Sequence, residues 1–188
     1  MSHAAAQHHD IAGDWTIDPD HSRFGFSARH AMVTTVRGAF NQVQGRFSVG
    51  ATPTDTSVRI TLATAAVDTR NAQRDEHLRS ADFFDVERWP EIVFVGTSVE
   101  EVEQNAYLVT GRLTIRDVTR EVTMPIELIG VQRDAYGNLR AGFEGSRRLN
   151  RRDFGLEWNV ALDAGGVLVS ERINVEYELS AIKSDTAS

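Results

Sequence analysis

The segment RDEHLRSADFF, residues 74–84, places His77 among carboxylates and arginines, residue types that serve acid–base catalysis or metal binding. Neither His77 nor His30 lies four residues from another histidine, as a helical zinc pair would. In DPDHS, residues 18–22, an aspartate before proline and another before His21 are typical of a turn at a strand junction. We therefore expect no metal site, and a structural role for these histidines.

Other catalytic signatures are missing from the sequence. It contains no cysteine, no G-x-S-x-G nucleophile elbow and neither phosphate-binding glycine motif. Adjacent acids such as Asp82 with Asp85, or Glu100 with Glu101, are typical of solvated loops. The expectation is that the protein has no catalytic residues and is not an enzyme.

One basic cluster stands out, formed by Arg147, Arg148, Arg151 and Arg152. Paired guanidinium groups suit a phosphate or pyrophosphate, so these arginines are candidates for binding a charged headgroup. A solvated connection between strands, with its arginines paired to nearby acids, is the favoured alternative.

Length and charge narrow the class of protein. The 188 residues suit one domain, and 27 acids against 20 bases give a net charge of −7, which argues against nucleic acid as a partner. No apolar run approaches the ~18 residues of a membrane span. The first residues lack the basic and apolar regions of a secretory signal, so we expect a cytoplasmic protein. We assign 1–12 to a disordered leader, 13–183 to the folded domain and 184–188 to a disordered tail.

Apolar residues recur at every second position through most of the chain, which predicts half-buried strands. The predicted strands are separated by turn sequences at 51–57, 100–106, 116–121, 133–138 and 162–166, and they include 14–18, 24–28, 58–62, 92–96, 107–115, 122–128, 139–143 and 173–179. About eight antiparallel strands favour an all-β barrel, because closure removes the sheet edges. Short helical segments are expected near 30–36 and 71–84, the second capped by Asn71 or Asp75.

The residues of one parity are aromatic and aliphatic, and a small barrel must fill its interior with side chains or with a ligand. From periodicity alone, an interior filled by side chains and an interior that holds a ligand are about equally supported.

Four blocks, FSARHAMVTTVRGAFNQVQGRF, DTRNAQRDEHLRSADFFDVERWPEIVF, GRLTIRDVTREVTMPIEL and FGLEWNVALDAGGVLVSERINVEYEL, closely resemble the YceI-like family in order and spacing. The resemblance runs from about Trp15 to Lys183. It implies a lipocalin-like antiparallel barrel whose apolar cavity holds a polyisoprenoid, an isoprenoid quinone or a similar amphiphile, without established catalysis. The ligand-binding residues we expect are Phe24, Phe26, His30, Phe40, Phe47, Leu62, Leu78, Phe83, Phe84, Phe94, Leu113, Met124, Phe143, Phe154 and Trp158.

On this interpretation the 74–84 segment is a cover over the barrel. Leu78, Phe83 and Phe84 face inward, while Arg74, Asp75, His77 and Arg79 bond to the rim and to water. The expected ligand is a lipid that the protein sequesters or carries, no cofactor is required, and a homodimer stays open. The alternative is a small barrel enzyme or stress-response protein that acts on a bound apolar substrate.

Overall fold

The computed structural model describes residues 11–184. Its strands are β1 (Gly13–Ile17), β2 (Arg23–His30), β3 (Thr34–Phe40), β4 (Val43–Val49), β5 (Ser57–Ala63), β6 (Val67–Asp68), β7 (Glu91–Glu103), β8 (Ala106–Ile115), β9 (Val118–Arg133), β10 (Leu139–Asn150) and β11 (Arg172–Lys183). Its helices are α2 (Ala72–Arg79) and the short 3-10 helices η1 (Pro19–His21), η2 (Pro53–Asp55), η3 (Thr64–Ala66) and η4 (Arg151–Phe154). In this range no helix has the length and apolar character needed to cross a membrane.

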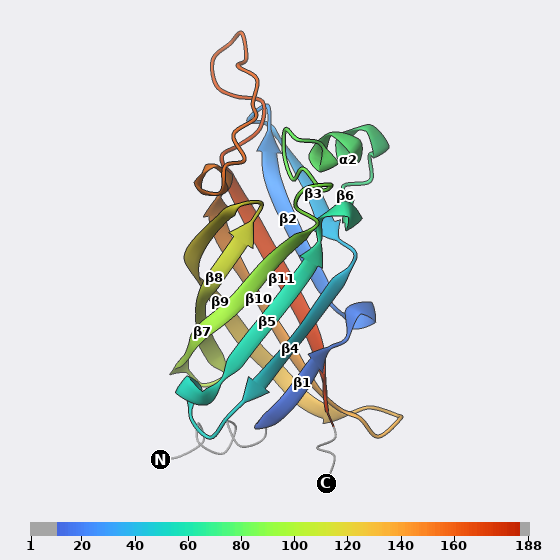
Figure 1. Ribbon diagram of the computed structural model, residues 1–188, viewed down its shortest axis with the longest axis vertical. Helices are drawn as coiled ribbons and strands as arrows, with labels where there is room; N and C mark the ends of the chain where they lie inside the picture. The colour runs from blue at the N-terminus through green and yellow to red at the C-terminus, as the bar shows by residue number, and fades with distance from the viewer. Residues whose placement is uncertain (1–10, 185–188) are drawn as a thin grey trace.

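Eight strands of the described chain close into an antiparallel barrel in the order β1-β4-β5-β7-β8-β9-β10-β11, because β1 pairs with both β4 and β11. The predicted barrel is confirmed. β2, β3 and β6 extend the sheet from β11, so that β1 and β2 share the same side of that strand at different heights. Figure 1 shows α2 and the 155–171 loop together at the upper end of the barrel.

The lower end is filled by a core of large side chains. Trp15 of β1 is almost fully buried and stacks on Phe47 with ring centroids 5.9 Å apart, and Phe47 meets Phe143 edge to face at 5.5 Å. Ile11 belongs to the same core, and its carbonyl accepts a hydrogen bond from the Trp15 indole. Ordered packing therefore begins before residue 13, where we had placed the start of the domain. Residues 1–10 and 185–188 of the predicted leader and tail lie outside the described chain.

One side of the barrel wall is split. The pairing of β9 with β10 runs from Leu139 opposite Arg133 to Glu144 opposite Glu127, and within the described chain it ends there. Above that point β9 pairs with β8 and β10 with β11. η4 packs against β9 at the top of the split, where Arg120 donates to the carbonyl of Asp153.

Two local predictions were wrong. The segment 30–36 is not helical: residues 31–33 form the turn of the β2–β3 hairpin, and Thr34 at the start of β3 pairs with His30 at the end of β2. The prediction also lacked β3 and β4, whose weaker alternation includes Gly38 and Gly45. Gly38 is required there, since an added Cβ would lie 2.5 Å from the Phe26 ring.

Candidate functional site

A cavity of about 720 Å³ occupies the upper part of the barrel. Alternating residues of the strands form its wall, and residues of α2 and of the 155–171 loop, which lie at the upper end of the barrel in Figure 1, complete the lining. The lining is mostly aliphatic and aromatic, and the volume falls within the range of sites that bury one organic ligand.

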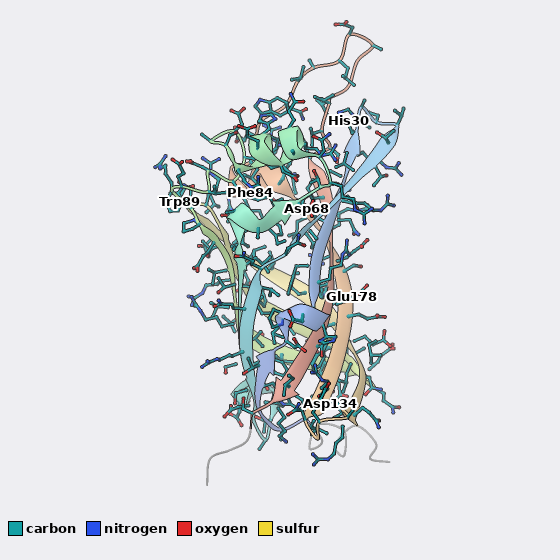
Figure 2. The ribbon with its side chains drawn as sticks, turned by 90° about the vertical axis from the view of Figure 1, so that its right-hand side faces the viewer. His30, Asp68, Phe84, Trp89, Asp134 and Glu178 are labelled. Carbon is teal, nitrogen blue, oxygen red and sulfur yellow. The ribbon has the colours of Figure 1, made fainter. Side chains whose placement is uncertain are left out.

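All the residues that we expected to bind the ligand, except Phe47 and Phe143, line this cavity. They come from the strands, from α2 and the turn after it, and from the 154–158 segment, and they are Phe24, Phe26, His30, Phe40, Leu62, Leu78, Phe83, Phe84, Phe94, Leu113, Met124, Phe154 and Trp158. His30 is exposed and sits at the upper end, whereas Asp134 marks the opposite end (Figure 2).

The expectation that Phe47 and Phe143 line the ligand site is corrected by the structure. Both have the predicted inward parity, but they pack with Trp15 in the lower core and do not line the cavity. The alternation of a strand gives the face of a residue but not its height in the barrel. Trp15 fills the lower end, so an inward residue at that height contacts other side chains.

The 74–84 segment lies over the cavity as a cover, and its polar groups hold it in place. Asn71 caps α2 by accepting from the backbone N–H of Arg74, and Arg74 donates to the hydroxyl and the carbonyl of Thr69. Asp75 is buried and accepts from the backbone N–H and the hydroxyl of Thr69 at 2.8 and 2.6 Å. Arg79 donates to the carbonyls of Ala65 and Val67. These bonds explain why so polar a segment can lie over an apolar cavity.

An aromatic contact joins the cover to the 155–171 loop. The ring of His77 on α2 meets Trp158 at 4.5 Å and Phe83 at 5.1 Å, edge to face in both cases, and its Nε2 lies 2.8 Å from Asp82. A second aromatic group, formed by Phe26, Phe40 and Phe84, has ring centroids 5.4–5.6 Å apart. The two groups lie along the upper cavity, where each ring buries apolar surface.

The four arginines of the basic cluster do not gather around one ligand site. Arg147 has inward parity opposite Val175, yet it is exposed, because the wall has already split at its height. Arg148 is exposed on the opposite parity, and Arg152 pairs with Glu171 at 2.9 Å. Only Arg151 lines the cavity.

Arg151 is 5% exposed and donates to three backbone carbonyls, those of Leu156, Val169 and Ser170, at 2.6, 3.4 and 2.9 Å. These bonds tie together both ends of the 155–171 loop. Burial lowers the pKa of Arg151, and the charge of Glu171 opposes that shift. The guanidinium has five N–H groups, so this buried cation retains donors for a further acceptor.

Sequence reasoning missed part of the lining. Many of the missed residues have the same parity as the predicted ones, so the period of two could have found them; they include Val58, Ile60, Ile92, Val109, Ile115, Ile126, Leu149, Ile173, Val175, Tyr177 and Leu179. The polar residues at the upper end, Arg29, Asn71 and Gln73, carried no periodic signal.

The chemistry open to these groups is limited. Across residues 11–184 no three histidine, aspartate or glutamate side chains lie close enough together to hold a metal ion. His21 lies 2.7 Å from Asp18 and His77 lies 2.8 Å from Asp82, so each forms a pair with one carboxylate. The site is organised for apolar contact, with its polar groups near the upper end.

A closed antiparallel barrel with one large apolar cavity defines a lipocalin-like class of protein. The comparison with protein families agrees, since the YceI-like domain model matches residues 15–181. The chain belongs to the YceI-like family.

Relatives in sequence carry the description UPF0312 protein. The one from Azotobacter vinelandii is 37% identical over 150 residues, 78% of each chain, and the one from Shewanella denitrificans is 36% identical over 170 residues, 89% of this chain and 87% of the other.

Two solved structures share the fold at low sequence identity. BcnA of Burkholderia cenocepacia has a TM-score of 0.74 at 21% identity, covering 87% of this chain and 98% of that one. A polyisoprenoid-binding domain from Saccharophagus degradans, implicated in plant cell wall breakdown, has a TM-score of 0.70 at 15% identity and covers 90% and 98%.

Proposed function

We propose that the protein binds one elongated apolar molecule, a polyisoprenoid or an amphiphile of similar shape, and sequesters or carries it without chemical change. The observation that carries the proposal is the cavity of about 720 Å³ with its mostly apolar lining. Such a wall offers few partners to a polar substrate, whereas a prenyl chain gains free energy from every part it buries. The polyisoprenoid-binding description of the Saccharophagus degradans domain supports the same ligand class.

The proposal also gives the ligand an orientation. The lower end is closed by Trp15, Phe47 and Phe143, so the apolar tail points down and the polar end stays near the mouth. Arg29, His30, Arg74 and Arg151 line the cavity there and supply donors for a hydroxyl, carbonyl or phosphate oxygen. No cofactor is required for this function.

Extraction of the purified protein with organic solvent, followed by mass spectrometry, tests the proposal. The expected result is a co-purifying prenyl lipid near one molecule per chain, and a delipidated protein that binds a prenyl alcohol again. Prolonged incubation should return the lipid unchanged. A modified product would contradict the non-catalytic part and support the enzyme alternative, and a protein that neither retains nor rebinds apolar lipid would contradict the whole proposal.

A further inference from the structure

Three exposed apolar side chains gather at the mouth end of the barrel. Met32 and Val33 of the β2–β3 turn are 60% and 76% exposed, and Val160 of the 155–171 loop is 47% exposed. We call these three residues the apolar rim. Figure 1 shows that both segments lie at the upper end of the barrel, the end at which α2 also lies.

The β2–β3 turn and the 155–171 loop form one continuous structure. The backbone N–H of Ala31 donates to the carbonyl of Leu168 at 2.8 Å, and His30 forms an isolated bridge with Val169. Leu168 and Val169 line the cavity. The backbone therefore joins the segments of the apolar rim directly to residues of the cavity wall.

The backbone of the β2–β3 turn makes these side chains hard to explain by folding. Ala31 and Met32 have φ values of 49° and 63°, in the left-handed region that favours asparagine and glycine. A turn selected only for stability would carry such residues. Met32 and Val33 are also largely exposed, so packing inside the protein does not account for them.

Charge sets the rim apart from the rest of an acidic protein. Residues 28–36 and 158–170 together hold one acid, Asp163, and one arginine, Arg29. By contrast, the β7–β8 hairpin at the lower end carries Glu100, Glu101 and Glu103. The chain as a whole carries a net charge of −7, but these two segments present a nearly neutral, apolar tip.

We infer that the apolar rim docks on the surface of a lipid bilayer, so that an apolar ligand passes between the membrane and the cavity without crossing water. The inference rests on the proposed lipid-binding function. It adds that a membrane is the source or the destination of the ligand. Shallow insertion of a few apolar side chains gives weak, reversible binding that scales with the buried area. Such binding suits a protein that must leave the membrane with its ligand.

Flotation with phosphatidylcholine vesicles that contain no isoprenoid tests the docking step alone. The Met32→Ser, Val33→Ser double variant should partition to the vesicles at least about five-fold less than the wild type, from the apolar area removed. The matched control is Val102→Ser with Ile129→Ser, which replaces side chains of 47% and 57% exposure away from the mouth and should bind like the wild type. Equal losses in both variants, or a wild type that does not float, would overturn the inference.

A second variant separates docking from folding. Ala31→Asn with Met32→Gly installs residues that suit the left-handed turn, so its Tm should rise while its vesicle partition falls. A variant that is more stable and floats as the wild type does would overturn the docking role of Met32.

Two further measurements keep this inference distinct from the proposed function and from self-association. Binding of a prenyl alcohol delivered from detergent should be the same in the wild type and the Met32→Ser, Val33→Ser variant, because neither residue lines the cavity. Failure of prenyl alcohol binding in the wild type would count against the lipid-binding function, whereas normal binding without flotation would count against the docking alone. Sedimentation that shows a wild-type dimer and a monomeric rim variant would assign the rim to a second copy of the chain and overturn the membrane inference.

Discussion

The hydroxyl of Tyr177 on β11 donates a hydrogen bond to the carbonyl of Pro125 on β9, across the strand β10 that lies between them. Gly145 of β10 is opposite Tyr177, and an added Cβ at Gly145 would overlap both the Pro125 carbonyl and the Tyr177 ring. The bond lies just above the last β9–β10 pair, Glu127 with Glu144. The N and carbonyl of a strand residue point to the same neighbour, so the missing N–H of Pro125 also faces the split, where it leaves no ladder bond unmade.

Tyr177→Phe should lower the free energy of unfolding by about 1–2 kcal/mol at pH 7, because it leaves the half-buried Pro125 carbonyl without this donor. Burial raises the pKa of Tyr177, and the charge of Arg147 only partly opposes this. The folded protein thus holds the phenolic proton more tightly than the unfolded chain, and that contribution is lost as pH rises above about 10. Urea unfolding from pH 7 to 11 should show the gap between wild type and Tyr177→Phe narrowing at the alkaline end. Tyr136→Phe, at a residue 90% exposed, is the control and should match the wild type throughout.

Phe94→Asp should abolish retention of a prenyl lipid and cost several kcal/mol of stability, because the carboxylate would face the apolar cavity without a partner. Val95→Asp is the matched control on the opposite face, where Arg59 and Arg112 are the cross-strand neighbours on either side. Lipid content by mass spectrometry and Tm should separate the two variants. Normal lipid retention in Phe94→Asp would show that the cavity is not the binding site.

Arg151→Ala should destabilise the protein by about 3 kcal/mol, since it removes three bonds to carbonyls at the two ends of the 155–171 loop. Arg148→Ala replaces an exposed arginine of the same cluster and should change stability by no more than about 0.5 kcal/mol. Urea denaturation measures both. Equal losses of stability in the two variants would mean that the buried hydrogen bonds of Arg151 do not stabilise the protein.

Arg140→Met should destabilise the protein at neutral pH and much less in acid. Arg140 lies 2.5 Å from Asp18 and 2.8 Å from Asp134. Its hydrogen bond lowers the pKa of Asp134; for Asp18, burial raises the pKa, but the bonds from Arg140 and His21 outweigh it and the pKa falls. Depressed carboxyl pKa values contribute stability above about pH 3.9, and this is lost as pH falls through the lower folded-state values. The difference in Tm between variant and wild type should therefore shrink between pH 5 and pH 2, and a constant difference would contradict the ion-pair account.

The face of each strand residue was predictable from the sequence, because a pleated strand alternates its side chains with a period of two. Val109 and Leu113 of β8 line the cavity for this reason, as does Met124, the cross-strand partner of Val109. The cover was predictable too, since Leu78, Phe83 and Phe84 interrupt an otherwise polar segment and Asn71 is a strong helix cap. A local pattern was sufficient in each case.

Only the tertiary structure decided how far down the barrel the cavity extends and which polar groups meet it. Phe47 and Phe143 have inward parity like Phe94, but contact with Trp15, distant in sequence from Phe143, places them in the closed lower end. Arg147 and Arg151 are similar in sequence context, yet one lies at the split between β9 and β10 and the other is buried among carbonyls of the 155–171 loop. The position of a residue along the barrel, the closure of the lower end and the burial of an arginine all depend on contacts between residues far apart in the chain. A local period of two carries no information about those contacts.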